Sequence, residues 1–227
     1  MIENKLFEEQ RQTLQFHSMH LKGREDLHLP RKIWHICGVS LMALIYAYFG
    51  KQTSLHILLP LISIILPLDL LRQRSRRLNA IVLKTFGWCM RKNEFDALSG
   101  TTYLFAGGLI LLFFSPHIVI LSLLFLAFAD PLASYFGIRF GRDRIVRQKT
   151  LQGTGAAFIV CCIISAIYYY QNNIMIERLF IVSPLSGVIG ALSELVPIGK
   201  LDDNFTFPVL CALFLSVLFY LFGGFGI

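Results

Sequence analysis

The sequence predicts an all-α polytopic membrane protein with about seven transmembrane helices, an N-terminus in the cytosol and a C-terminus outside. Three observations lead to this prediction: the composition, seven long apolar runs and an uneven distribution of basic residues. Of the 227 residues, 55% are hydrophobic and 15% are charged, whereas an ordinary soluble domain is about half apolar and about a quarter charged. The composition therefore excludes a disordered protein, a collagen-like fibre and a soluble nucleic-acid-binding domain, despite the net charge of +7.

The apolar runs have the length that a membrane crossing requires, because a spanning helix needs about 20 mostly apolar residues. They cover residues 33–49, 54–71, 99–114, 117–138, 151–171, 179–196 and 205–222. Residues 78–90 are also apolar, but Lys84 and Gly87 interrupt them and Trp88 favours the membrane interface. This segment is predicted to be an amphipathic helix that lies on the membrane surface.

The basic residues predict the orientation of these helices. The segments 1–32, 72–92 and 139–149 carry six, seven and five Lys or Arg residues, and Lys200 precedes the last run. The opposite side carries only Lys51 and Arg178, so the two sides differ by 19 to two. Because cytosolic loops carry the excess of Lys and Arg, the N-terminus is predicted to be cytosolic.

Two parts are expected along the chain: a cytosolic N-terminal arm over residues 1–32 and a single transmembrane domain over residues 33–227. The arm is polar and lacks an apolar core, so we expect no cleavable signal peptide. The five cysteines are odd in number and lie mostly in apolar runs. They predict neither a disulfide framework nor a C-x-x-C metal pair.

Ionisable residues gather at the cytosolic ends of the predicted helices. Asp130 lies about eight residues inside the fourth run, or about 12 Å deep, so it must be paired or bind an ion. A transporter needs a polar route through both halves of the membrane. An enzyme that takes one substrate from the cytosol and another from the bilayer needs polar residues only where the two meet. The one-sided pattern favours an enzyme, and residues 33–227 would then form its catalytic domain.

Four of these residues are acidic, namely Asp130, Glu194, Asp202 and Asp203, and they occur among many basic ones. This mixture suits a nucleotide with Mg²⁺, because carboxylates hold the ion and Lys and Arg neutralise the remaining phosphate charge. Alternatively, Asp202, Asp203 or Asn204 could simply cap the last helix.

The segment from Lys149 to Gly155 combines a lysine, hydroxyl groups and glycines at a predicted helix start, which is an arrangement that can bind phosphate. It is not a Walker A loop, because its lysine comes first. Helix packing is an alternative explanation for its glycines and threonines.

Two further positions have open interpretations. His35 suits a structural hydrogen bond as well as a base or a phosphate contact. Asp69 and Arg72 are three residues apart on one helix face, a spacing more typical of a local ion pair than of a catalytic dyad.

Taken together and in this order, the polar segments resemble the CTP-dependent lipid kinases, which include the yeast-type diacylglycerol kinase, dolichol kinase and phytol kinase. The resemblance extends from about Pro30 to Pro208. It rests on PRKIWH at 30–35, LDLLR at 68–72, MRKNE at 90–94, ADPLASYFGIRFGR at 129–142, KTLQGT at 149–154, and ALSELVP followed by DDNFTFPV within 191–209. Most of these motifs are closer to the diacylglycerol kinase branch, whereas Pro131 after Asp130 is similar to phytol- and polyprenol-type members.

The resemblance implies transfer of the γ-phosphoryl group of CTP to a lipid hydroxyl, giving a lipid phosphate and CDP. The lipid would be diacylglycerol or a polyprenol- or phytol-type alcohol, and the membrane the bacterial inner membrane or the endoplasmic reticulum, with a cytosolic active site. No nucleic-acid partner is expected, and the sequence leaves open whether the chain forms a homo-oligomer.

The resemblance and the residue pattern together give the expected site residues, which fall into four groups. The expected catalytic residues are Asp130, Glu194 and Lys149, with either Asp130 or Glu194 accepting the proton of the lipid hydroxyl. The expected Mg²⁺ ligands are Asp130, Asp202, Asp203 and Asn204. The expected contacts of the CTP phosphates are Arg31, Lys32, Gly137, Arg142, Lys149, Thr150, Gly153 and Lys200. Further candidates are His35, Asp69, Arg91 and Lys92.

Two alternative functions are compatible with parts of this pattern. A phosphatidate cytidylyltransferase also brings CTP to a membrane lipid, but it transfers CMP and releases pyrophosphate. A small-solute transporter is the non-enzymatic alternative, and the one-sided polar layout disfavours it.

Overall fold

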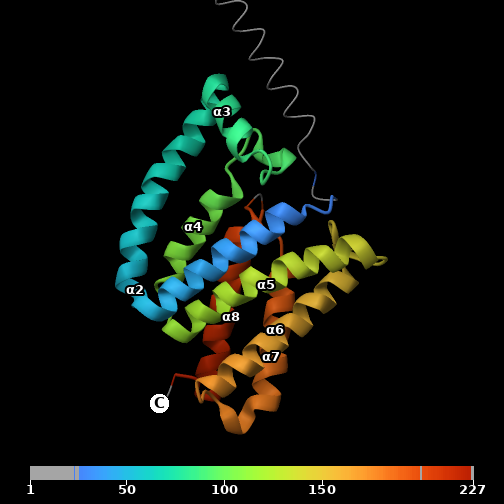
Figure 1. The fold of residues 1–227 in the computed structure, drawn as a ribbon. Helices are drawn as coiled ribbons and strands as arrows, with labels where there is room; N and C mark the ends of the chain where they lie inside the picture. The colour runs from blue at the N-terminus through green and yellow to red at the C-terminus, as the bar shows by residue number, and fades with distance from the viewer. Residues whose placement is uncertain (1–22, 24–25, 200, 226–227) are drawn as a thin grey trace, which may run out of the picture.

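The computed structural model describes residues 23, 26–199 and 201–225, and most of the predicted N-terminal arm lies outside them. The described residues are almost entirely helical (Figure 1), as the sequence predicts. The main helices are α2 (Leu29–Arg74), α3 (Arg76–Phe86), α4 (Gly100–Leu111), α5 (Pro116–Phe140), α6 (Leu151–Gln171), α7 (Leu179–Leu195) and α8 (Asp203–Phe222). Two short 3₁₀ turns, η1 (Lys92–Glu94) and η2 (Ile176–Arg178), precede α4 and α7.

The first two predicted spans belong to one long element, α2, which is bent into two arms (Figure 1). The bend is at Gly50, whose backbone angles are φ 74° and ψ −173°. This conformation is essentially restricted to glycine. Because no other residue type adopts it without strain, Gly50 determines where the chain reverses.

Five of the described helices are long and apolar enough to cross a membrane: α2, α5, α6, α8 and the segment Ile176–Leu195, which includes α7. The third predicted span is shorter than expected, because α4 has only 12 residues and is therefore about 18 Å long. The described part of the chain thus agrees with an all-α membrane protein. The number of seven spans and the orientation of the chain remain predictions.

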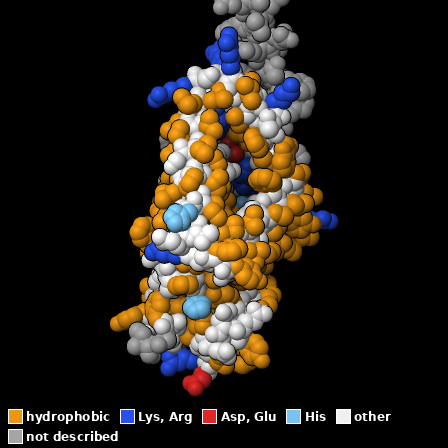
Figure 2. Space-filling model, turned by 60° about the vertical axis from the view of Figure 1, so that its left-hand side comes forward, with side chains coloured by type: hydrophobic (Ala, Val, Ile, Leu, Met, Phe, Trp, Pro, Cys, Tyr) orange, Lys and Arg blue, Asp and Glu red, His pale blue; other side chains and the backbone are white. Residues whose placement is uncertain are grey.

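The surface agrees with a membrane environment. Hydrophobic side chains cover most of the face in Figure 2, and several Lys and Arg side chains stand out at its upper end. Helix α3 itself has the predicted amphipathic character: Leu83 is buried, whereas Ile81 and the basic Lys84 are exposed.

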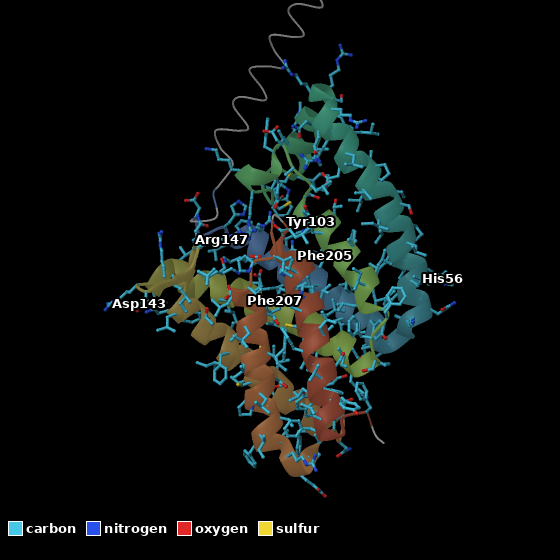
Figure 3. All side chains as sticks on the ribbon, turned by 180° about the vertical axis from the view of Figure 1, so that it is seen from behind. His56, Tyr103, Asp143, Arg147, Phe205 and Phe207 are labelled. Atoms are coloured by element: carbon cyan, nitrogen blue, oxygen red, sulfur yellow. The ribbon has the colours of Figure 1, made fainter. Side chains whose placement is uncertain are left out.

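The core is centred on α5, which packs against α2, α6 and α8. Phe125 and Leu126 of this helix are fully buried. Small residues let neighbouring helices approach closely, as is common in membranes. A Cβ atom at Gly187 of α7 would clash with the Cys162 sulfur of α6. On α4, a Cβ atom at Gly107 would lie 3.3 Å from the Cα atom of Phe205 on α8; Figure 3 shows Phe205 beside Tyr103 of α4.

A small β-hairpin was not expected from the sequence. Strands β1 (Arg144–Val146) and β2 (Lys149–Thr150) pair antiparallel between α5 and α6. The sequence places Lys149 and Thr150 at the opening of the fifth helix; they form β2, and α6 begins directly after them at Leu151, where the run 151–171 predicts it. The Thr150 hydroxyl caps α6 by accepting a hydrogen bond from the Gly153 N–H at 3.2 Å.

We predict that Gly50→Ala destabilises the protein through backbone strain alone, because a Cβ atom there would meet nothing within 4 Å. Strain of this kind amounts to about 1–3 kcal/mol, and it is measured as a lower unfolding temperature in detergent. Gly38→Ala is the matched control, since its Cβ atom is equally unobstructed and the position is helical. Equal unfolding temperatures for the two variants would contradict the role of Gly50.

The orientation predicts which sites a membrane-impermeant thiol reagent can label. Single cysteines at Ser75 and Arg144 should be labelled from the cytosolic side, and those at Gln52 and Asn173 from outside, in a background without the five native cysteines. All four positions are exposed and all five native cysteines are free thiols. Labelling of both pairs from the same side would overturn the topology.

Candidate active site

A cavity of about 740 Å³ opens where one end of α5 meets the β-hairpin, the ends of α6 and α7, and the start of α8. Its lining is rich in charge of both signs. The acidic side chains are Asp130, Glu194 and Asp203, and the basic ones are Arg91, Arg144, Arg147 and Lys149. All three catalytic residues expected from the sequence therefore line one cavity.

Lys149 lies at the centre of this charge cluster. Its Nζ atom is 2.8 Å from Oε1 of Glu194 and 3.3 Å from Oδ2 of Asp203. Burial by itself would lower the pKa of Lys149, but the nearby carboxylates of Asp203, Glu194 and Asp130 outweigh that effect and raise it. The ammonium group consequently stays protonated at neutral pH and presents a fixed positive charge to the cavity.

Glu194 is fully engaged by protein groups. One oxygen faces Lys149, and the other accepts a hydrogen bond from the Thr154 hydroxyl at 3.4 Å. The last turn of α7 supplies the glutamate and the first turn of α6 supplies the threonine. Glu194 therefore fastens α7 to the start of α6 and holds Lys149.

Asp130 differs from the other two acids in its contacts. It projects from α5 into the cavity and, among the residues that the structure describes, it makes no hydrogen bond and no ion pair. His35, Lys149, Arg91 and Lys32 are close enough to act on its charge. A carboxylate that lines the cavity near basic side chains but has no direct protein partner is available to a ligand or to a cation.

Lys32 and His35 contact α5 near Asp130. The Lys32 ammonium donates hydrogen bonds to the Ser134 hydroxyl at 2.6 Å and to the Pro131 carbonyl at 3.3 Å. A ring nitrogen of His35 lies 3.1 Å from the Leu126 carbonyl oxygen. This structural hydrogen bond is one of the two interpretations that the sequence left open for His35.

Arg31 has protein partners outside the cavity. Its guanidinium pairs with Glu94 at 2.7 Å and donates to the Cys89 carbonyl at 2.7 Å. It fastens the segment that leads to α4 onto the start of α2.

The three consecutive polar residues at the start of α8 point in different directions. Asp202 caps the helix by accepting a hydrogen bond from the Asn204 N–H at 3.1 Å, and it lies 3.9 Å from Arg91. The Asn204 side chain donates to the Gly100 carbonyl at 3.0 Å and so joins α8 to α4. Of the three, Asp203 is the one that lines the cavity.

The four expected metal ligands are thus not assembled into one coordination shell. Among residues 23, 26–199 and 201–225, no group of three or more His, Cys, Asp and Glu side chains is placed to hold a metal ion. Asp130 and Asp203 share the cavity, whereas Asp202 and Asn204 have structural partners.

The two glycines expected at the phosphates lie where α5 crosses α6. A Cβ atom at Gly153 would be 2.7 Å from the Ala133 carbonyl oxygen and 3.3 Å from the Cα atom of Gly137. Both glycines also line the cavity, together with Thr150. Because glycine has no side chain, the two helices can pack closely here, and no side chain at these positions fills the cavity.

The remaining expected phosphate contacts are placed differently. Arg142 is exposed and does not line the cavity, whereas Arg144 and Arg147 from the hairpin do. Arg147 donates to the Gly199 carbonyl at 3.4 Å, and Figure 3 shows Asp143 farther out, at the edge of the molecule. Lys92 is exposed and Lys200 lies outside the described residues. Arg144 and Arg147 belong to the basic segment 139–149 that the sequence singled out, but the fold is needed to show that these two exposed arginines line the cavity.

Fold and site together define an apolar helical protein with a charged cavity at one end of its helices, suited to a phosphorylated ligand. Three curated proteins are similar to this chain over most of its length, and each is named CTP-dependent diacylglycerol kinase 1. The protein from Saccharomyces cerevisiae is 31% identical over 228 residues, covering 87% of this chain and 78% of the relative. The protein from Eremothecium gossypii is 32% identical, covering 88% and 72%, and that from Schizosaccharomyces pombe is 27% identical, covering 84% and 93%.

These similarities show that the chain belongs to the CTP-dependent lipid kinase family. The resemblance drawn from the ordered motifs is thereby confirmed, and the chain is an enzyme of this class. No protein-family model matches the chain, and no solved structure matches it significantly.

We predict that Asp130→Asn leaves the protein folded while its initial rate falls by about 100-fold or more, because misplacing reacting groups by about 1 Å can have an effect of that size. Its unfolding temperature should stay equal or rise, since a partly buried charge without a direct protein partner is removed. Both quantities are measured on the same detergent-purified sample.

Asp143→Asn is the control for this prediction. Asp143 is an exposed acid between the end of α5 and β1, and its carboxylate accepts a hydrogen bond from the Gln152 side chain at 3.1 Å. This variant should keep nearly full activity. A stable and fully active Asp130→Asn enzyme would refute the role of Asp130, and a marked loss of stability would indicate a structural ion pair instead.

Proposed function

We propose that this protein transfers the γ-phosphoryl group of CTP to the hydroxyl group of diacylglycerol, giving phosphatidate and CDP. The observation that carries the proposal is the cavity in which Lys149, Asp130, Glu194 and Asp203 meet at one end of an apolar helical bundle. The names of the three relatives support CTP as the donor and diacylglycerol as the acceptor.

The cations of the cavity would bind the triphosphate. Phosphoryl transfer depends chiefly on positioning and on neutralising the charge of the phosphate oxygens. Lys149 is held in place by two carboxylates, and Arg91, Arg144 and Arg147 surround the same space. Arginine suits this role because its planar group can contact two phosphate oxygens at once. We propose Arg144 and Arg147 in place of Arg142.

The acids of the cavity fit a Mg²⁺ ion that is bound mainly through the nucleotide. Mg²⁺ in such sites takes one or two carboxylates and completes its shell with phosphate oxygens and water. Asp130 and Asp203 are the carboxylates that would hold it, since Glu194 has both oxygens engaged. When bound, the ion supplies charge neutralisation at the phosphates.

The two candidates for accepting the hydroxyl proton are no longer equivalent. Glu194 is occupied by Lys149 and Thr154, so its role is to position the lysine. Asp130 has no protein partner among the described residues and faces the cavity. Of the two, we therefore propose Asp130 as the carboxylate that contacts the lipid hydroxyl. The loose transition state of phosphoryl transfer requires little help from a base, so this contact does not compete with the role of Asp130 at the ion.

The lipid would approach from the side of the bundle. Figure 2 shows a hollow in the apolar face with acidic and basic side chains at its bottom. Between the two arms of α2 there is also a shallow apolar groove, lined by Met42, Tyr46, Leu58 and Leu123 among others. Leu123 precedes Asp130 by seven residues on α5, or about 10 Å of helix. We place the acyl chains along this apolar face of the bundle, with the glycerol group near Asp130.

These assignments imply an integral membrane enzyme with its active site on the cytosolic side. The cytosol supplies CTP, and the positive-inside rule places the basic segments that surround the cavity on that side. A polyprenol- or phytol-type alcohol is the alternative acceptor, and a lipid panel distinguishes it from diacylglycerol.

The test is turnover of radiolabelled CTP by the purified protein with diacylglycerol, dolichol and phytol. We expect CDP and phosphatidate from diacylglycerol, a requirement for Mg²⁺ that EDTA reveals, and slower turnover with ATP. Pyrophosphate as the product would indicate a cytidylyltransferase. Equal or faster turnover with ATP would overturn the donor assignment, and preference for another alcohol would overturn the acceptor.

A further inference from the structure

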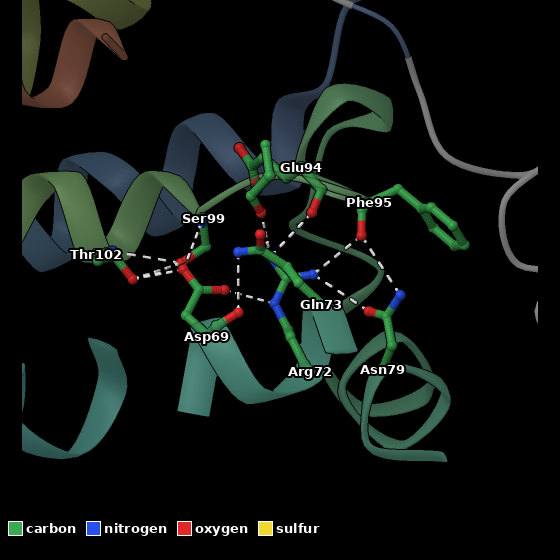
Figure 4. Close-up of polar contacts among 9 residues, drawn as sticks. Asp69, Arg72, Gln73, Asn79, Glu94, Phe95, Ser99 and Thr102 are labelled. Atoms are coloured by element: carbon green, nitrogen blue, oxygen red, sulfur yellow. Dashed lines mark hydrogen bonds and ion pairs between the residues drawn. The ribbon is translucent and has the colours of Figure 1, made fainter. Parts of the chain in front are cut away.

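A second charged cluster lies outside the cavity, at the C-terminal end of α2. Asp69 and Arg72 form an ion pair there, with side chains only 4% and 2% exposed. Their partners are Asn79 of α3 and the segment 94–102 that leads into α4 (Figure 4). We name Asp69, Arg72 and Asn79 the α2 clamp.

Arg72 fixes the backbone that precedes α4. Its guanidinium donates to the carbonyl oxygens of Glu94 at 2.9 Å, Phe95 at 3.4 Å and Ala97 at 2.7 Å. It also donates to the Asn79 side chain at 3.2 Å. A guanidinium has five donors in a rigid fork, whereas a lysine has three on one atom. The arginine can therefore hold several carbonyls that a lysine could not reach together.

Asp69 fixes the start of α4 itself. Its Oδ2 atom accepts hydrogen bonds from the Ser99 N–H at 2.6 Å and from the Thr102 hydroxyl at 2.7 Å. Ser99 is the N-cap of α4. Both charged residues of the clamp, Asp69 and Arg72, thus form hydrogen bonds with the segment 94–102.

This segment is connected directly to the cavity. The Glu94 carboxylate pairs with Arg31 at 2.7 Å, and Arg31 also donates to the Cys89 carbonyl at 2.7 Å. Residues 89–94 are therefore fastened at both ends, and Arg91, which lines the cavity, lies between these points.

We propose that the α2 clamp positions Arg91 for binding the phosphates of CTP, which makes Arg72 a positioning residue of this enzyme. This inference rests on the proposed function. The α2 clamp contains one ion pair, Asp69 with Arg72, and the segment it holds contains a second, Glu94 with Arg31. The four charges therefore sum to zero. Buried ion pairs add little net stability compared with apolar packing, whereas their directional bonds fix one geometry of the segment.

A double-mutant cycle between Arg72→Lys and Arg91→Gln tests the coupling. Arg91→Gln should raise KM for CTP by about tenfold, as expected for the loss of a charge-assisted contact to phosphate. Arg72→Lys should raise KM for CTP by about threefold to tenfold and leave KM for diacylglycerol unchanged. In the Arg91→Gln background, Arg72→Lys should add less than about twofold.

The controls separate positioning from stability. Gln73→Ala removes a side chain that donates only to the Asp69 carbonyl in the same helix, so it should change neither KM. If Arg72→Lys does not fold, Asn79→Ala replaces it in the cycle, because it loosens the same segment through Phe95. Unfolding temperatures are recorded for every variant.

The outcomes distinguish this inference from the proposed function. The positioning role would be overturned if the KM for CTP of the double variant rose by the product of the two single effects. It would also be overturned if Arg72→Lys changed KM equally for CTP and diacylglycerol. In both cases the parent enzyme would still form CDP. A parent enzyme that forms no CDP would overturn the proposed function first. Coupled effects confined to CTP would establish the clamp.

Discussion

The contact of Lys149 with Glu194 and Asp203 is the interaction on which the site depends. It joins the hairpin before α6, the end of α7 and the start of α8. Lys149 is 22% exposed and Glu194 is 7% exposed, so water screens the pair only weakly. Removing the lysine would leave two carboxylates facing each other beside Asp130. The cluster therefore sets both the shape of the cavity and its charge.

The apolar bundle makes this arrangement possible by placing polar groups at one end of well-packed helices. Glycines at positions 137 and 153 let α5 and α6 cross closely enough for Thr150 and Asp130 to line the same space. The break at Gly50 returns α2 to the same end, so that Arg31 at its start and Arg72 at its finish both contact the segment before α4. Backbone geometry far from the cavity thus holds the segment that carries Arg91, which lines the cavity.

Much of the architecture could be predicted from the sequence, because hydropathy and local spacing carry it. The run 151–171 coincides with α6, and the Asp69–Arg72 ion pair follows from a spacing of three on a helix. The cap formed by Asp202 was one of the two interpretations that the sequence left open. Long-range geometry was not accessible in the same way. All three arginines of the hairpin region are exposed, and no local pattern distinguishes Arg142 from Arg144 and Arg147, which line the cavity. The partners of Asn204 and Arg31 could not be predicted either, because they are distant in sequence.

The way the buried acids are partnered separates structural from chemical roles. Asp69, Glu94 and Glu194 each face an arginine or a lysine of the protein, and each joins two elements of the fold. Asp130 has no such partner among the described residues, although four basic side chains act on it from a distance. A carboxylate inside an apolar helix is costly unless something compensates its charge. The other buried acids named here have protein partners, whereas Asp130 faces the cavity. We infer that the partner of Asp130 is a group that binds together with the substrate. We therefore propose that Asp130 takes part in the chemistry and that the paired acids hold the site in shape.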